Sequence, residues 1–198
     1  MNPTVTSKED IIAACQKIAK ERGLEAISMR SVASECGMAV GSVYNYFSSK
    51  SELLCATIEN IWKDIFHMSA SQCAFSDFVE CLSWLFDSIQ KGSQMYPEFF
   101  SRHAMVFASE DQKAGHQMME KYFHHLEENL LNVLHRDPNI REDAFDEVLT
   151  PELFINYVLE LFVSSVFHFQ KDYRGILTLV RRCLYSSDYQ ILYRRSCK

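Results

Sequence analysis

Glycine and proline are scarce in this chain, with 6 glycines and 4 prolines among 198 residues. Both residues tend to end or bend helices, so their scarcity favours long helices joined by few turns. No segment sustains the alternation of apolar and polar residues that is typical of a half-buried strand. Because 47% of the residues are hydrophobic, the chain can form a sizeable core and is not expected to be disordered. The sequence therefore predicts an all-α protein.

Signatures of catalysis and metal binding are also missing. The chain contains no GxSxG, no HExxH and no phosphate-binding loop. Its seven cysteines include no CxxC pair, and their dispersed positions without a signal peptide predict reduced thiols in the cytoplasm. The adjacent His124 and His125 point to different faces of a helix, which disfavours a shared metal ion. We therefore expect no enzyme activity, no cofactor and no metal site.

Positive charge is limited as well, since the net charge is −6. Residues 1–50 carry six Lys and Arg against five Asp and Glu, a net charge of +1, so the other 148 residues carry −7. This distribution excludes nucleic-acid binding through a broad basic patch, although a few well-placed cations and helix termini can still hold phosphates. A membrane span is not expected either, because the most apolar stretch, 151–171, has Glu160 near its centre.

One short region has the pattern of two small helices joined by a turn. Ser28 is a good N-cap for the first helix, and Gly37 can adopt the positive φ that ends it. A second short helix is expected over residues 40–46. Two short helices joined through a glycine turn form a helix-turn-helix, here predicted over residues 28–47.

The second of these helices begins with small side chains, at residues 39–42. Such a helix N-terminus can approach a DNA groove closely, and its free N–H groups favour anions. The Tyr44 hydroxyl can reach a phosphate oxygen. Ser49 and Glu52 predict a capping box for the next helix, where Lys50 can pair with a phosphate. The candidate DNA-binding residues are Ser28, Arg30, Ala39, Val40, Gly41, Ser42, Tyr44, Asn45, Tyr46 and Lys50.

This pattern resembles the DNA-binding domain of the TetR (tetracycline repressor-like) family of bacterial transcription regulators. The residues that carry the resemblance are Ser28, Arg30, Val32, Ala33, Cys36, Gly37, Met38, Ala39, Gly41, Tyr44, Tyr46, Phe47, Lys50 and Leu53. One departure is Ala39, where the family has a serine that caps the recognition helix; the loss of such a cap costs about 1 kcal/mol. The resemblance covers about residues 5–65. It implies a three-helix DNA-binding domain there and a helical effector-binding and dimerisation domain over 66–198.

Amphipathic patterns predict the other helices. Ser7 is expected to cap the first helix and Gly23 to end it, and Thr150 followed by Pro151 is a typical helix start. Gly92 is expected to end the helix that precedes it. Beyond the first helix and the helix-turn-helix, helices are expected over 50–69, 77–91, a short stretch after Pro97, 109–135, 151–171 and 176–184.

The resemblance also implies a site for a small-molecule effector in the second domain. Aromatic and methionine side chains could line such a site, although the same residues at helical spacing commonly fill a core. The candidate lining residues are Trp62, Phe66, Trp84, Phe99, Phe100, Met105, Phe107, Met119, Tyr122 and Phe123.

The stretch 151–171 is apolar on nearly all sides, which predicts burial against the chain's own core and against a partner chain. In the resembled family, the last two helices pack against their copies in a dimer. The candidate interface residues are Leu159, Phe162, Val166, Phe169, Val180 and Leu184.

These patterns and the resemblance predict a cytoplasmic, homodimeric, DNA-binding transcription regulator. We expect it to be a repressor that leaves a palindromic double-stranded operator when an unknown small molecule binds. The alternative is a DNA-bound scaffold of the same fold that recruits a protein partner and has no small-molecule ligand. A helical enzyme is the least favoured prediction.

Overall fold

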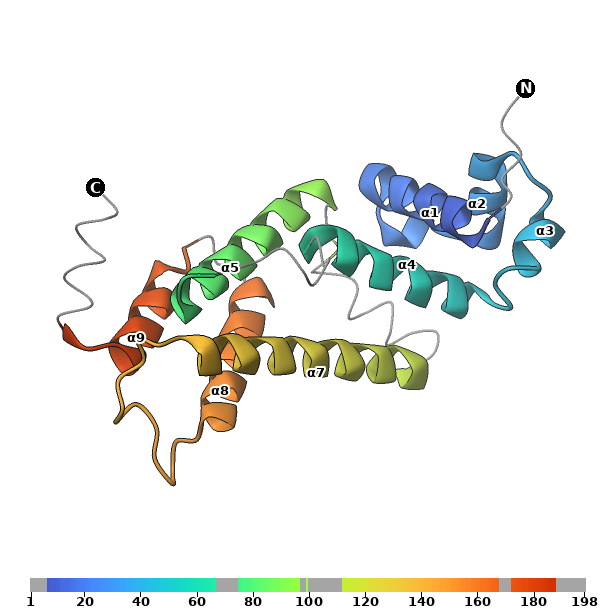
Figure 1. Ribbon diagram of the computed structural model, residues 1–198. Helices are drawn as coiled ribbons and strands as arrows, with labels where there is room; N and C mark the ends of the chain where they lie inside the picture. The colour runs from blue at the N-terminus through green and yellow to red at the C-terminus, as the bar shows by residue number, and fades with distance from the viewer. Residues whose placement is uncertain (1–6, 67–74, 97–98, 100–111, 168–171, 188–198) are drawn as a thin grey trace. The chain divides into compact units, whose positions relative to one another are not determined.

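The computed structural model describes residues 7–66, 75–96, 99, 112–167 and 172–187. All regular structure in these ranges is helical, which confirms the all-α prediction (Figure 1). The chain divides into two compact units, of which the first contains Met1–Met68 and Ile89–Glu120 and the second contains Ser69–Ser88 and Lys121–Lys198. The first unit thus takes in residues beyond the predicted boundary near residue 65. No helix in the described ranges is long and apolar enough to cross a membrane.

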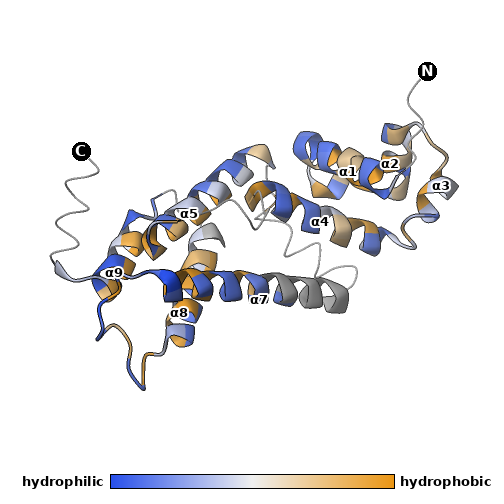
Figure 2. Ribbon diagram, viewed as in Figure 1, coloured by the Kyte–Doolittle hydropathy of each residue, from blue (hydrophilic) through white to orange (hydrophobic). Residues whose placement is uncertain are grey.

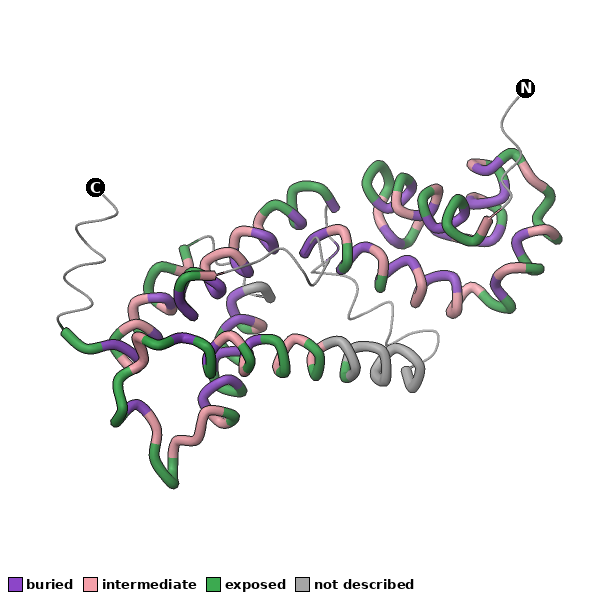
Figure 3. The backbone as a smooth tube through the Cα atoms, in the orientation of Figure 1, coloured by how far each residue is buried: buried purple, intermediate pink, exposed green. Residues whose placement is uncertain are grey.

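The first unit begins with four α-helices that follow the predicted order. They are α1 (Lys8–Arg22), α2 (Met29–Cys36), α3 (Val40–Tyr44) and α4 (Lys50–Phe66), with a 3-10 turn at Leu24–Ala26. Helix α1 packs against α2 and α4, and α2 packs against α3. Apolar and polar residues alternate along α1 and α4 (Figure 2). Buried and exposed positions alternate along the same two helices (Figure 3). The amphipathic pattern therefore forms the core of this unit.

The ends of these helices show how closely local sequence determines them. The Asp10 N–H donates to Ser7 Oγ at 3.1 Å, and Gly23 ends α1 with a φ of 78°. The prediction that the second motif helix reaches Tyr46 is wrong, because α3 ends at Tyr44. The predicted capping box at the start of α4 is also only half correct. Ser49 Oγ does accept from the Glu52 N–H, but the Glu52 carboxylate accepts from Ser48, one residue earlier.

Helix α5 (Phe78–Met95) continues past Gly92, so the prediction that this glycine ends the helix is wrong. A Cβ placed on Gly92 would lie 2.7 Å from Ile65 Cγ1 and 2.9 Å from Ile65 Cδ1. Glycine at this position therefore permits α5 to approach α4 closely. Because isoleucine is branched at Cβ and has few rotamers, Ile65 cannot easily move away from a larger residue.

We predict that Gly92→Leu destabilises the protein by about 1–3 kcal/mol, because the added side chain overpacks the contact with Ile65. Thermal unfolding measures the loss. The matched control is Gly175→Leu in α9 (Arg174–Leu184), where a Cβ would meet no atom within 4 Å. That variant should be as stable as the wild type or more stable, since leucine is the better helix former. Equal destabilisation at both glycines would contradict the packing role of Gly92.

The second unit contains the first part of α5, much of α7 (Gln112–Arg136), α8 (Pro151–Phe167) and α9. Its core includes an aromatic cluster in which the Phe86 ring stacks on Tyr173 at 4.6 Å and meets Phe162 edge-on at 5.1 Å. Thr150 caps α8 as predicted, with its Oγ1 3.3 Å from the Leu153 N–H. The predicted last turn of this helix, 168–171, lies outside the described residues.

A buried carboxylate holds the start of α5 within the second unit. Asp137 Oδ2 accepts hydrogen bonds from the Phe78 N–H at 2.9 Å and from the Tyr185 hydroxyl at 2.6 Å. Burial, together with this carboxylate, raises the pKa of Tyr185 above its usual range, so the hydroxyl stays protonated and donates. These contacts join residues 59 and 48 positions apart, so no local pattern in the sequence predicts them.

Candidate nucleic-acid interface

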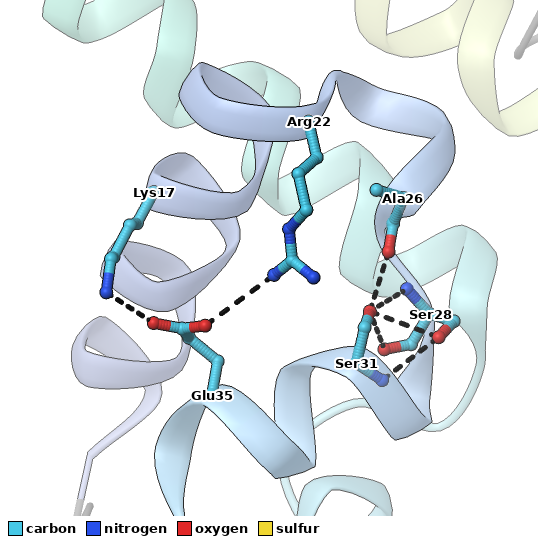
Figure 4. Close-up of polar contacts among 6 residues, drawn as sticks. All are labelled: Lys17, Arg22, Ala26, Ser28, Ser31 and Glu35. Carbon is cyan, nitrogen blue, oxygen red and sulfur yellow. Dashed lines mark hydrogen bonds and ion pairs between the residues drawn. The ribbon is translucent and has the colours of Figure 1, made fainter.

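The start of α2 is fixed by a reciprocal pair of serines (Figure 4). Ser28 Oγ accepts from the Ser31 N–H at 3.0 Å, and Ser31 Oγ accepts from the Ser28 N–H at 2.9 Å. The Ser31 hydroxyl also lies 2.7 Å from the carbonyl oxygen of Ala26. Ser28 is therefore a half-buried cap, and its hydroxyl serves the chain's own backbone. In this structure, the side chain of this candidate residue positions the start of α2.

Glu35 joins α2 to α1 through two ion pairs (Figure 4). Its carboxylate lies 2.6 Å from Lys17 Nζ and 3.6 Å from the Arg22 guanidinium. The hydrogen bond from Lys17 lowers the pKa of Glu35, so this carboxylate keeps its charge at neutral pH. No local pattern in the sequence predicts these pairs, because their partners are 18 and 13 positions apart.

Two further cations of residues 1–50 are paired inside the first unit. Lys8 Nζ lies 3.7 Å from Glu52, and Lys20 Nζ lies 3.4 Å from Asp64. Asp64 also accepts from the Tyr96 hydroxyl at 2.5 Å, which connects the residue after α5 to α4. With Lys17 and Arg22, four of the six cations are thus engaged with carboxylates. Arg30 lies exposed near the start of α2, and Lys50 is half-buried at the start of α4.

The surface of α3 is open, while its anchor is fully buried. Val43 and Phe47 are both 0% exposed, and they hold the short helix to the core of the first unit. By contrast, Val40 is 36% exposed and Tyr44 is 53% exposed. A Cβ on Gly41 would meet no atom within 4 Å, so no packing inside the described chain requires glycine there. The exposed candidate residues on and beside α3 are Ala39, Val40, Gly41, Tyr44 and Asn45, and the half-buried ones are Ser42 and Tyr46.

The turn before α3 has the predicted geometry. Gly37 has a φ of 66° and a ψ of 30°, which is the left-handed conformation that ends a helix. Ala39 takes the N-cap position of α3 with extended backbone and makes no side-chain cap. The amide groups at the start of α3 therefore lack the side-chain acceptor that a serine would supply. A DNA phosphate is one acceptor that could replace it.

The candidate effector residues are divided between the two units. In the first unit, Trp62 stacks on Phe66 with ring centroids 5.5 Å apart and meets Phe99 edge-on at 5.4 Å. Trp84 is half-buried in the second unit beside Phe75, and Phe123 is half-buried on α7. The side chains of Phe100, Met105, Phe107, Met119 and Tyr122 lie outside the described part of the chain.

Most of the candidate interface residues are buried in the core of the single chain. Leu159, Phe162, Val180 and Leu184 are at most 8% exposed within the single chain. The side chains of Val166 and Phe169 are not among those described. Among the side chains of α8 and α9 that the structure describes, the large apolar ones left exposed are instead Tyr157 at 50%, Leu161 at 38% and Leu179 at 52%. The sequence could not single out these three residues, because the apolar pattern does not show which apolar side faces the core.

No metal site is formed by the residues that the structure describes, where no three potential ligands among His, Cys, Asp and Glu come together. His124 and His125 lie on the exposed surface of α7, and each has a ring nitrogen within 3.4 Å of Glu128.

Comparison with known proteins connects this geometry to a family. Residues 11–57, which span α1, α2, α3 and the start of α4, match the family model described as bacterial regulatory proteins, tetR family. The match includes the turn at Gly37 and the exposed face of α3. Proteins of curated function gave no match to the chain at a significant level.

Solved structures of transcription regulators share the fold at low sequence identity. A regulator from Rhodococcus sp. Rha1 is 22% identical, with a TM-score of 0.59 over 88% of this chain and 87% of that one. A TetR-family regulator from Marinobacter aquaeolei VT8 is 14% identical, with a TM-score of 0.57 over 84% and 81%. BioQ, solved with its natural double-stranded DNA operator, is 19% identical, with a TM-score of 0.51 over 90% and 98%.

Proposed function

The chain belongs, through residues 11–57, to the tetR family of bacterial regulatory proteins, and on this premise we propose that it is a homodimeric repressor released from a palindromic operator by a small molecule. The observation that carries the proposal is the exposed face of α3. Its side chains are open to a partner while Val43 and Phe47 anchor the helix, and Gly41 leaves space that the chain itself does not use. An α-helix presented in this way fits the major groove of DNA.

The remaining candidate residues would hold the phosphate backbone around that groove. Arg30 is exposed on α2, Tyr44 is exposed on α3, and Lys50 begins α4. Phosphate contacts of this kind fix the position of a protein on DNA without selecting a sequence. In this proposal, DNA binding depends on these few groups and on the α3 surface.

A palindromic operator requires two copies of α3 about 34–36 Å apart, and hence a dimer with two-fold symmetry. The exposed Tyr157, Leu161 and Leu179 supply an apolar surface for such a dimer. Tyr157 and Leu161 are four residues apart, so they lie on one side of α8. This surface replaces the buried residues that the sequence analysis selected.

For the effector, the aromatic group of Trp62, Phe66 and Phe99 is the best-supported candidate. Its rings lie in the first unit, on and near the last turns of α4, which is the helix that begins beside α3. A ligand that binds one arrangement of α4 better than another would shift the populations of the two arrangements, and so change DNA affinity. The domains of this proposal are a DNA-binding domain at 5–65 and an effector and dimerisation domain at 66–198, and Trp62 and Phe66 stand at the boundary between them in the sequence.

A mobility shift with the DNA next to the gene tests the proposal directly. The purified protein should retard this DNA at nanomolar concentration and release it when the correct member of a small-molecule panel is added. Quenching of tryptophan fluorescence by that molecule, lost in Trp62→Phe, would connect release to the aromatic group. A protein that binds the DNA but responds to no molecule, and instead retains a second protein on it, would favour the scaffold alternative.

We predict that Tyr44→Phe and Lys50→Ala weaken binding to operator and to unrelated DNA alike, because both residues are assigned to phosphates. Lys50→Ala should also reduce the slope of log affinity against log salt by about one. Titrations at several salt concentrations measure this slope. The control is Lys63→Ala on the same helix, where Nζ is paired with Glu59 at 2.7 Å, and its slope should equal that of the wild type. A changed base preference in either variant, with non-specific affinity preserved, would disprove the assignment.

A further inference from the structure

The proposed recognition surface lacks the side chains that most often recognise guanine. Residues 37–49 contain no Arg, Lys, Gln, His, Asp or Glu. Guanine is most commonly recognised by Arg or Lys that donates to O6 and N7 in the major groove. Neither α3 nor the residues directly beside it can make that contact, so recognition there depends on small and apolar side chains and on uncharged polar groups such as those of Ser42 and Asn45.

Val40 is the apolar side chain best placed for contact with a base. It is 36% exposed, whereas Val43, on the same helix, is 0% exposed and fills the core. Its neighbours on the chain, Ala39 and Gly41, are exposed and small, so neither covers its methyl groups. A large apolar side chain left in water at this position gains free energy only when a partner covers it.

The major groove offers one apolar group at the base edges, the C5-methyl of thymine. On the basis of the proposed DNA-binding function, we propose that Val40 contacts a thymine methyl, and that each half of the operator carries a thymine at this position. The inference goes beyond DNA binding because it specifies which base the α3 surface selects and which atoms make the selection.

The test removes the interacting methyl groups from both partners. Binding of the full chain to a pool of duplexes with randomised base pairs first enriches an operator. Each thymine of that operator is then replaced in turn, in both halves, by deoxyuridine, which keeps the base pair and removes only the C5-methyl. Affinities are measured for the wild type, for Val40→Ala and for Val148→Ala. Val148 is a matched control because it is 80% exposed in the loop before α8.

We expect one position at which loss of the thymine methyl weakens wild-type binding by about fourfold in each half, the effect of one buried methyl group. Val40→Ala should weaken binding to the thymine operator and lose this sensitivity, whereas Val148→Ala should keep it. Val40→Ala should also unfold at the wild-type temperature or above, since Val40 is exposed and alanine is the better helix former.

Two results would overturn the inference while leaving the proposed function intact. One is an enriched operator whose every thymine tolerates deoxyuridine, and the other is a Val40→Ala variant that keeps the full wild-type sensitivity. A pool that yields no enriched sequence would instead contradict the proposed function, and the inference with it.

Discussion

Replacement of Leu161 by glutamate is expected to convert the protein from dimer to monomer and to abolish operator binding. Leu161 is 38% exposed on α8 and Tyr157, one turn earlier, is 50% exposed, so the core of the chain covers neither side chain completely. In the proposed dimer the new carboxylate would be buried without a partner, which costs about 3–5 kcal/mol. The dimer dissociation constant should therefore rise more than a hundredfold. Sedimentation at micromolar concentration, beside a mobility shift, measures both effects.

The adjacent residue supplies a control for this experiment. Phe162 is 3% exposed and its ring meets Phe86 at 5.1 Å, so Phe162→Glu should unfold the second unit itself. Leu161→Glu should instead keep the wild-type helix content and melting behaviour at low concentration. A folded Leu161→Glu variant that stays dimeric would exclude this face of α8 from the interface. A wild-type monomer that still binds a palindrome would exclude the dimer altogether.

The contrast between these neighbours shows what the sequence can and cannot predict. The apolar character of 151–171 predicted a helix with more than one buried side, and α8 does bury Phe154, Ile155 and Val158. The pattern could not separate core from exposed surface, because both sides are apolar and only packing decides which one the chain covers. The chosen residues Leu159 and Phe162 proved to belong to the core.

The helix-turn-helix was predicted more completely because its signals are local. Ser28 as a cap and Gly37 at positive φ each depend on residues within a few positions. Gly92 shows the opposite case. A glycine near the expected end of a helix has the same local appearance whether it stops the helix or admits a neighbour, and only the position of Ile65, 27 residues earlier in the chain, distinguishes the two.

Long-range polar contacts were the other part that the sequence could not supply. The ion pairs of Glu35 with α1 and the hydrogen bonds of Asp137 join residues that are distant in the chain. The Glu35 pairs matter for the candidate interface because they engage Lys17 and Arg22, two of the six cations of residues 1–50. A count of lysines and arginines alone therefore overestimates the positive charge that residues 1–50 can present to phosphates.

Gly41→Leu is expected to abolish specific DNA binding while the fold stays intact. The position is exposed in α3, and a Cβ there would meet no atom of the described chain within 4 Å, so a side chain can leave the backbone without a clash. Leucine also favours the helix over glycine by about 1 kcal/mol, so the melting temperature should hold or rise. On DNA, the same side chain would occupy the space through which α3 approaches the groove. We expect specific affinity to fall more than a hundredfold in mobility shifts with the operator.

Gly41→Ala provides the graded control for this last prediction. A single methyl group should reduce operator affinity by much less than leucine does, because it adds little depth to the α3 surface, and it should stabilise the helix by a similar amount. Loss of affinity that grows with side-chain size, at constant or higher stability, is the signature of a close approach to DNA. A Gly41→Leu protein that unfolds would show that glycine is needed for the fold. One that binds the operator as tightly as the wild type would show that α3 does not enter the groove at this residue.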